Sequence, residues 1–182
     1  MVLGEGAAVV ALEDWDLAQN RGAKILAEIT GYGISTDNHH LTQPNPSGVG
    51  PRSAMEQALA SAQIDPAEVD YINAHGTATR FNDSAEAKAI HDLFPSSVAV
   101  SSTKSMMGHS LGAAGAIEAI VCILAIQHRF LPPNINFNRS DSDVELNIVA
   151  NEPRRQAPHT VLSNSFGFGG TNASIVLQSP RS

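Results

Sequence analysis

Apolar positions along the chain follow two different periods. In "KILAEITGYGIST", residues 24–36, every second position is apolar, which predicts a strand running into a glycine-rich bend. In "RSAMEQALASAQI", residues 52–64, Met55, Leu59 and Ala62 follow one another at helical spacing. Because strand and helix patterns alternate to the C-terminus, the pattern predicts an α/β fold with helices on both faces of the sheet.

The same analysis predicts the remaining elements, and it leaves 37–51, which is rich in proline and glycine, as a loop. The predicted elements are helices at 12–23, 84–94 and 110–130, a short strand ending at 73–75, strands at 98–104 and 146–151, and a strand–turn–strand unit at 160–178.

The beginning of the chain has an unusual pattern. A turn-like Gly-Glu-Gly is followed at 7–12 by "AAVVAL", which predicts a buried strand. A domain seldom opens within a strand and without a leader. The pattern therefore predicts that the chain begins inside a larger fold.

Composition and charge narrow the class of protein. A chain of 182 residues, 42% apolar and 16% charged, fits one globular domain. A net charge of −7 without a basic tract argues against a nucleic-acid partner. The longest apolar run, "AIVCILAI" at 119–126, is too short for a membrane span, and the N-terminus lacks the basic region of a signal peptide. A single cysteine excludes an internal disulfide framework and fits a cytoplasmic location.

Three polar, glycine-containing segments each follow a predicted strand. They are "NAHGTATRFNDSAE" at 73–86, "SSTKSMMGHS" at 101–110 and "SNSFGFGGTN" at 163–172. Ligands of α/β folds usually bind at the carboxyl ends of strands, so the three segments are expected to meet at one site.

Two histidines in these segments suggest a pair of hydrogen-bond donors. His109 directly precedes a predicted helix, whose partial positive charge disfavours an imidazolium. A neutral imidazole there can donate an N–H to an oxygen that becomes negative during a reaction. His75 has a similar strand-end position. The alternatives are a histidine that satisfies a buried backbone group, and a metal ligand, although no metal-binding pattern such as HExxH is present.

The helix after His109 begins with the small residues 112–116, although glycine inside a helix costs about 1 kcal/mol relative to alanine. Their presence suggests close approach by another backbone or by a ligand. "GFGGTN" matches neither a phosphate-binding loop nor a full dinucleotide fingerprint, so the sequence gives little support for a nucleotide.

"NAHGTAT", "KSMMGH" followed by "SLGAAGA", and "NSFGFGGTN", in this order, resemble the β-ketoacyl-[acyl-carrier-protein] synthases, the condensing enzymes of fatty-acid and aromatic polyketide synthesis. The resemblance implies the C-terminal half of a thiolase-like fold, with a mixed five-stranded sheet. It also implies that residues 1–24 are the closing strand and linker of the N-terminal half, and that residues 25–182 are the C-terminal thiolase-like domain.

The resemblance implies a decarboxylative Claisen condensation in which a malonyl thioester attacks an acyl group held on a cysteine. His75 and His109 match the two histidines that stabilise the malonyl enolate. The nucleophilic cysteine of the family lies in the N-terminal half, so the chain is expected to be inactive alone. Cys122, surrounded by aliphatic residues, is instead expected to be a core residue.

The resemblance assigns roles to further residues. Lys104 is expected to pair with Glu86 and to hold the histidines, the alternative being a solvated ion pair of little effect. Phe168 matches a gating residue whose backbone N–H joins the oxyanion hole, the alternative being a hydrophobic plug. The other matches are Asp83 in the Lys104 network, Thr77 and Thr79 at the phosphopantetheine arm, Thr42 at its entrance, and Asn73, Glu118, Ser163 and Asn164 around a structural Na⁺, K⁺ or Mg²⁺ ion that some members hold.

No cofactor is expected beyond the phosphopantetheine arm of acyl carrier protein. The implied partners are acyl carrier protein, malonyl and acyl thioesters, the N-terminal half, and a second subunit in a homodimer or heterodimer; a membrane is not among them. Arg80 and Met107 depart from common fatty-acid patterns and leave the pathway and the acyl chain length open. The alternative is a non-catalytic half-protein or a chain-length-factor-like subunit, against which the intact histidine pair argues.

Overall fold

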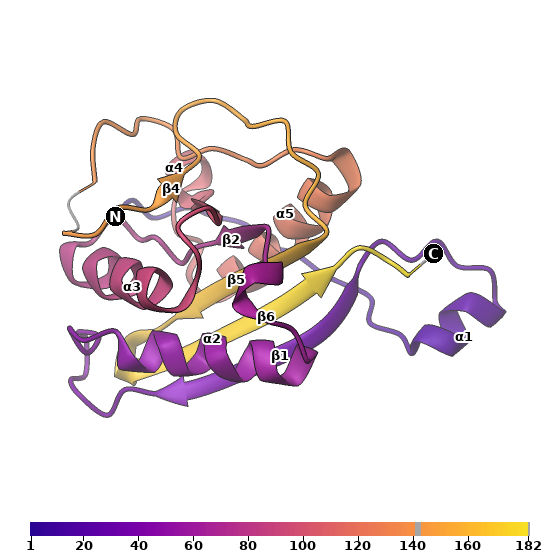
Figure 1. Cartoon of the computed structure of the whole chain (residues 1–182), viewed down its shortest axis with the longest axis horizontal. Helices are drawn as coiled ribbons and strands as arrows, with labels where there is room; N and C mark the ends of the chain where they lie inside the picture. Colours follow the sequence, from indigo (N-terminus) through magenta and orange to yellow (C-terminus); the bar gives the residue numbers. More distant parts are fainter. Residues whose placement is uncertain (141–142, 182) are drawn as a thin grey trace.

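The computed structural model describes residues 1–140 and 143–181. Their strands form one mixed sheet in the order β1-β6-β5-β2-β3-β4 (Figure 1). β5, β2, β3 and β4 run parallel to one another, whereas β6 is antiparallel to both β5 and β1. The strands are β1 Glu28–Thr36, β2 Tyr71–Asn73, β3 Ala99–Ser101, β4 Asn147–Ile148, β5 Thr160–Phe166 and β6 Thr171–Gln178.

The α/β class is as predicted, but the expected five strands are in fact six. The predicted strand at 146–151 shortens to the two-residue edge strand β4. The N–H of Val149 still donates to the carbonyl of Val100 in β3 (2.9 Å), but the carbonyl of Val149 accepts from the N–H of Asn134 (2.8 Å), and Ala150 forms a bridge with Asn134 instead of with a strand of the sheet.

The predicted helices are present. The first, α1, begins after Asp14, whose carboxylate accepts from the backbone N–H groups of Asp16 (3.0 Å) and Leu17 (3.3 Å) as an N-cap. The helices are α1 Trp15–Asn20, α2 Val49–Ala62, α3 Arg80–Leu93, α4 Lys104–Met107 and α5 Ala114–His128, with 3₁₀ turns η1 Pro66–Glu68, η2 Leu111–Ala113 and η3 Phe168–Gly170.

Helices cover both faces of the sheet, as predicted (Figure 1). Because successive strand residues point to opposite faces, Ile72 packs with α2 and α3 while its neighbour Tyr71 packs with α5. β1 approaches α2 very closely, since a Cβ on Gly31 or Gly33 would overlap the helix backbone. The fold therefore has a sheet between two helical layers.

The segment "AAVVAL" is not the buried strand that its pattern predicts. Residues 7–12 belong to no strand among the described residues, and Val9 is 91% exposed. An apolar run has strand geometry only where a neighbouring strand supplies hydrogen bonds, and no strand in the described part of the chain lies beside it. Residues 2–4, just before this segment, form a backbone bridge to the domain between Leu3 and His109.

The outer part of the sheet has an uncovered apolar side. Ile29, Tyr32 and Ile34 of β1 are exposed on the side away from α2. In the register of the sheet, Tyr32 lies beside Ile175 and Ile34 beside Ala173 of β6. Contiguous exposed apolar surface of this kind commonly marks a protein interface.

One segment, Leu111–His128, is long and apolar enough to cross a membrane by length and composition alone, with a mean hydropathy of 1.7. This differs from the sequence-based expectation, which found no apolar run long enough to span a membrane. A buried helix of a globular core passes the same test. In this fold α5 packs on the sheet through Cys122 and Ile126, in the cluster that contains Tyr71.

Candidate active site

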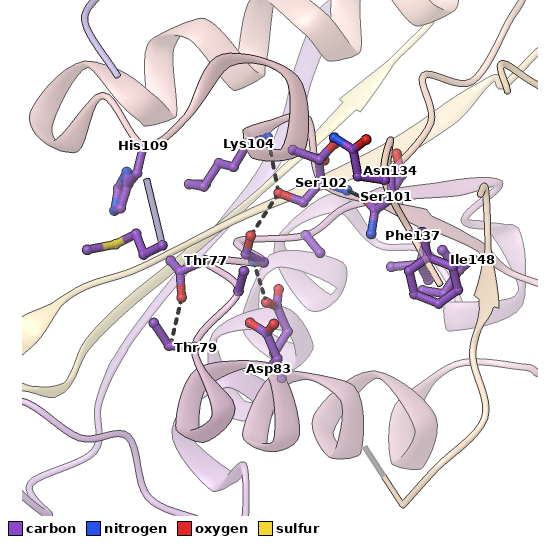
Figure 2. Close-up of a pocket in the computed structure, with 18 of the residues that line it drawn as sticks. Thr77, Thr79, Asp83, Ser101, Ser102, Lys104, His109, Asn134, Phe137 and Ile148 are labelled. Atoms are coloured by element: carbon purple, nitrogen blue, oxygen red, sulfur yellow. Dashed lines mark hydrogen bonds between the residues drawn. The ribbon is translucent and has the colours of Figure 1, made fainter. Parts of the chain in front are cut away.

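The three sequence motifs leave the sheet at the same edge. β5, β2 and β3 are adjacent and parallel, so the residues that follow their carboxyl ends lie side by side. A cavity of about 680 Å³ opens beside two of these ends. Figure 2 shows His109, Thr77 and Thr79 on one side of this cavity and Asn134, Phe137 and Ile148 on the other.

His109 lies in the turn between α4 and η2 and lines the cavity. Its Nδ1 accepts a hydrogen bond from the backbone N–H of Leu111 (3.2 Å), which leaves the proton of the neutral ring on Nε2. Burial, with a smaller effect of Lys104, lowers the pKa of His109. A lowered pKa favours the neutral ring; burial and Lys104 are the identified causes, whereas the sequence argument relied on the helix dipole.

His75 follows β2 and is only 6% exposed. Its ring centroid lies 5.4 Å from that of His109, with the ring planes at 85°. Burial, Lys104 and His109 together lower the pKa of His75 to about 3, so this ring is neutral as well. Its Nδ1 is buried and has no hydrogen-bond partner among the described residues.

Glu86 on α3 fixes the backbone at His75. Its carboxylate accepts from the backbone N–H groups of His75 (2.8 Å) and Gly76 (2.9 Å), and from Nδ2 of Asn164 (3.2 Å). Burial raises the pKa of Glu86, and these N–H donors oppose that shift. The expected Lys104–Glu86 pair is therefore wrong, because the Glu86 oxygens are taken by N–H groups.

Lys104 pairs instead with Glu118 of α5, and both side chains are buried. Burial raises the pKa of Glu118 to about 7, although the ammonium of Lys104 lowers it. The sequence analysis assigned Glu118 to a cation site; its Oε1 accepts from the Lys104 ammonium. This pair joins α4 to α5 on either side of the turn that carries His109.

Thr77, Thr79 and Asp83 all line the cavity (Figure 2). The hydroxyls of Thr77 and Thr79 lie 2.9 Å apart and share a hydrogen bond. Burial raises the pKa of Asp83, against hydrogen bonds from Asn82 and the backbone. The cavity lining thus contains two adjacent hydroxyl groups and the carboxyl group of Asp83.

Thr42 and Phe168 lie away from the cavity lining. Thr42 is exposed, and its backbone N–H donates to Nδ1 of His40 (3.1 Å). Phe168, in η3, is 77% exposed. Its loop touches the loop of Thr42, since Gly169 N–H donates to the carbonyl of Leu41 (2.6 Å).

Asp37 holds these two loops together, and the sequence analysis missed it. Its N–H donates to the carbonyl of Gly170 (2.8 Å), and its carboxylate accepts from Asn172 Nδ2 (2.8 Å) and from the N–H of Asn45 (2.6 Å). Gly170 has φ +78°, and a Cβ on it would meet Asp37. The paired glycines of "GFGG" were the only signal of this contact.

The residues assigned to a cation are all buried, and only some have free oxygens. Asn73 Oδ1 and Glu118 Oε2 lack hydrogen-bond partners among the described residues, and hard cations favour such oxygens. Asn164 Oδ1 is already used, because it accepts from the hydroxyl of Ser174 (2.7 Å). Within residues 1–140 and 143–181, no group of three or more His, Cys, Asp or Glu side chains is placed to hold a metal.

Cys122 is a core residue, as its sequence context predicts. The thiol lies in the cluster around Tyr71, and burial raises its pKa to about 12. A protonated, enclosed thiol is not a nucleophile. Of the small residues at 112–116, Gly112 has open space around it, since a Cβ on it would meet nothing within 4 Å, whereas a Cβ on Gly115 would lie 3.3 Å from the hydroxyl of Ser165.

Phe166 is a further contact that the sequence analysis missed. Its ring lies 5.7 Å from the ring of His75 and packs against it from the end of β5. Phe166 is the first phenylalanine of "NSFGFGG", whereas the family resemblance assigns a role only to the second, Phe168.

Residues 26–138 match the family described as "Beta-ketoacyl synthase, C-terminal domain". The 3-oxoacyl-[acyl-carrier-protein] synthase 2 of Coxiella burnetii is 50% identical over 97% of this chain and 43% of its own length. A putative mitochondrial 3-oxoacyl-[acyl-carrier-protein] synthase of Schizosaccharomyces pombe is 45% identical over 97% of this chain and 43% of its own length.

A solved structure described as the ishigamide ketosynthase/chain length factor is also similar, with a TM-score of 0.94 and 42% identity over 98% of this chain and 44% of that chain. The chain thus spans less than half the length of these relatives, and it shares their thiolase-like fold. It belongs to the β-ketoacyl synthase family, of which it represents the C-terminal half.

Proposed function

We propose that this chain supplies the enolate-stabilising half of a β-ketoacyl-[acyl-carrier-protein] synthase. The observation that supports this most directly is the pair of histidines with rings 5.4 Å apart. His109 lines the cavity with its ring proton on Nε2, and burial beside it lowers the pKa of His75 to about 3. Two neutral N–H donors stabilise an oxyanion without themselves losing a proton.

In the proposed reaction the bond between the malonyl carboxylate and C2 breaks and carbon dioxide leaves. The bonding electrons pass to the thioester oxygen, which the N–H groups of His75 and His109 stabilise as an enolate. C2 then attacks the acyl carbon held on a cysteine, and the carbon–sulfur bond to that cysteine breaks. The products are a 3-oxoacyl thioester and the cysteine thiolate.

The substrate is proposed to arrive on the phosphopantetheine arm of acyl carrier protein, past the hydroxyls of Thr77 and Thr79 in the cavity wall. A relative's solved structure is described as a ketosynthase in complex with its acyl-carrier protein. Thr42 and Phe168, outside the cavity lining, are proposed to contact the arm and to gate the site. The Asp37 contact supports coupled motion of their two loops.

The nucleophilic cysteine is proposed to come from an N-terminal half that covers the apolar side of β1 and β6. Ile29, Tyr32 and Ile34 are exposed there, and burying them would stabilise the complex. We place the complete enzyme in the cytoplasm as a dimer; one relative is named as mitochondrial, so an organelle is the other location considered.

A structural Na⁺ or K⁺ ion is proposed beside Asn73 and Glu118. The two unpartnered oxygens, Asn73 Oδ1 and Glu118 Oε2, fit such an ion. Ser163 would be a further ligand, whereas Asn164 can contribute only through its backbone because Ser174 occupies its side-chain oxygen. The ion would hold β2, β5 and α5 together behind the histidines.

The experiment is a chimaera in which this chain replaces the matching segment, 43% of the length, of the Coxiella burnetii relative. Formation of 3-oxoacyl-[acyl-carrier-protein] from malonyl and acyl carriers is expected, with the unmodified relative as control. A chimaera that assembles and binds acyl carrier protein but forms no product would favour the chain-length-factor-like alternative. Two similar solved structures, each described as a ketosynthase with a chain length factor, give precedent for it.

The pH dependence distinguishes neutral histidines from ordinary ones. Because the pKa of His75 is lowered to about 3 and that of His109 is also lowered, decarboxylation by the chimaera is expected to stay constant as pH falls from about 8 to about 6. Stability is expected to fall as pH drops from about 6.5 toward 3, because only the unfolded histidines bind protons there. A rate that halves near pH 6.5 at constant folded fraction would contradict the assignment.

A further inference from the structure

Residues 2–4, which we call the strap, bind the backbone of His109 on both sides. The N–H of His109 donates to the carbonyl of Val2 (2.8 Å), and the N–H of Gly4 donates to the carbonyl of His109 (3.0 Å). These two bonds form a parallel bridge between Leu3 and His109.

The strap reaches His109 only because glycines face each other at the contact. A Cβ on Gly4 would overlap the carbonyl oxygen of Met107, so any side chain there would push the strap away. Gly108 has φ +73°, and a Cβ on it would lie 3.0 Å from the Gly4 nitrogen. The contact is one of backbone against backbone.

The ring of His109 is fixed from the other direction. Leu111 donates its N–H to Nδ1 of His109 (3.2 Å), and to do so it adopts φ +53°. A left-handed conformation is costly for leucine and persists only where the surroundings enforce it. The strap on one side and Leu111 on the other thus determine both the position of the backbone and the direction of Nε2.

We infer that the strap is a positioning element for the reaction and that Gly4 is a positioning residue for His109. The inference deepens the proposed function and rests on it. Segment 1–24, which the sequence analysis assigned to the preceding half, therefore contributes to the site through its first residues. The His75 backbone is held separately, by Glu86, so the two donors have independent supports.

The test compares two glycine-to-alanine variants in the chimaera. Gly4→Ala displaces the strap, whereas Gly112→Ala adds the same methyl group three residues after His109, where it meets nothing within 4 Å. Displacing a donor by about 1 Å can cost about 10²-fold in rate. We expect Gly4→Ala to lower kcat for malonyl-thioester decarboxylation by about 10- to 100-fold with KM nearly unchanged, and Gly112→Ala to match the parent.

Nitrogen-15 NMR of labelled histidines supplies a readout independent of activity, with His109 assigned by its absence in His109→Gln. The parent should show nitrogen-15 shifts of a His109 ring that carries its proton on Nε2. In Gly4→Ala these shifts should no longer correspond to a single Nε2-protonated ring. If Gly4→Ala does not fold, Leu3→Gly serves instead, with Leu3→Ala as its control, because the Leu3 side chain is exposed and the glycine loosens only the strap backbone.

Equal kcat values and unchanged His109 resonances in Gly4→Ala and Gly112→Ala would overturn the inference. So would a lower melting temperature of Gly4→Ala with unchanged kcat, which would make the strap merely structural. If the parent chimaera binds its substrates but does not decarboxylate, the proposed function fails, and the His109 resonances alone decide whether the strap positions the ring.

Discussion

His109→Ala is expected to lower malonyl-thioester decarboxylation by the chimaera by about 10²–10³-fold, and His75→Ala by a similar factor. Each substitution removes one N–H donor from the developing enolate oxygen. Because both rings are neutral, no proton transfer is lost, and the effect should fall on kcat and on kcat/KM alike.

Two further variants make this result specific. His109→Gln keeps an N–H donor and should retain more activity than His109→Ala. His91→Ala removes an exposed histidine of α3 and should leave the rate unchanged. Equal rates for the parent and His109→Ala would exclude His109 as a donor.

Lys104→Met is expected to lower the free energy of unfolding by about 3–5 kcal/mol, because it leaves the buried Glu118 without its partner. The loss should be smaller at low pH, since the pKa of Glu118 is already raised to about 7 and its carboxyl then becomes neutral. Urea unfolding of the chain, followed by circular dichroism, measures the change.

The matched control is Lys88→Met, which breaks an exposed ion pair with Asp92 on α3 and should change stability by less than about 1 kcal/mol. The double variant Lys104→Met/Glu118→Leu should recover much of the lost stability, since both charges are then removed. If Lys104→Met costs no more than Lys88→Met, the buried pair does not hold α4 to α5.

The position of the site followed from the sequence because it depends on strand direction. His75 and His109 each follow a strand of the parallel group, and parallel neighbours end at the same edge of the sheet. Glycine and hydroxyl residues at those ends were visible as motifs. The cavity beside them needed no long-range information beyond the order of the strands.

The partner of Lys104 could not be predicted in the same way. Glu86 on α3 and Glu118 on α5 are both buried acidic residues, and which of them faces Lys104 depends on how the two helices are rotated. The backbone N–H groups of His75 and Gly76, after β2, donate hydrogen bonds to Glu86, and no sequence pattern indicates these bonds. The expected pairing was wrong for this reason.

The N-terminal segment shows a different limit. "AAVVAL" has the pattern of a buried strand, but a pattern indicates only what a segment can pair with. Within the described residues, Leu3 before this segment pairs with His109, whereas 7–12 belong to no strand and Val9 is 91% exposed. The contact depends on Gly4 and Gly108 approaching across a gap of about a hundred residues in sequence, which no local periodicity reveals.

The central claim is that this chain by itself provides the groups that generate the enolate. The most direct test is release of carbon dioxide from malonyl-[acyl-carrier-protein] by a chimaera whose nucleophilic cysteine, in the relative's half, has been replaced by alanine. We expect decarboxylation to continue without the cysteine and to be lost when His75 and His109 are also replaced by alanine. Decarboxylation that persists without both histidines would show that they do not generate the enolate.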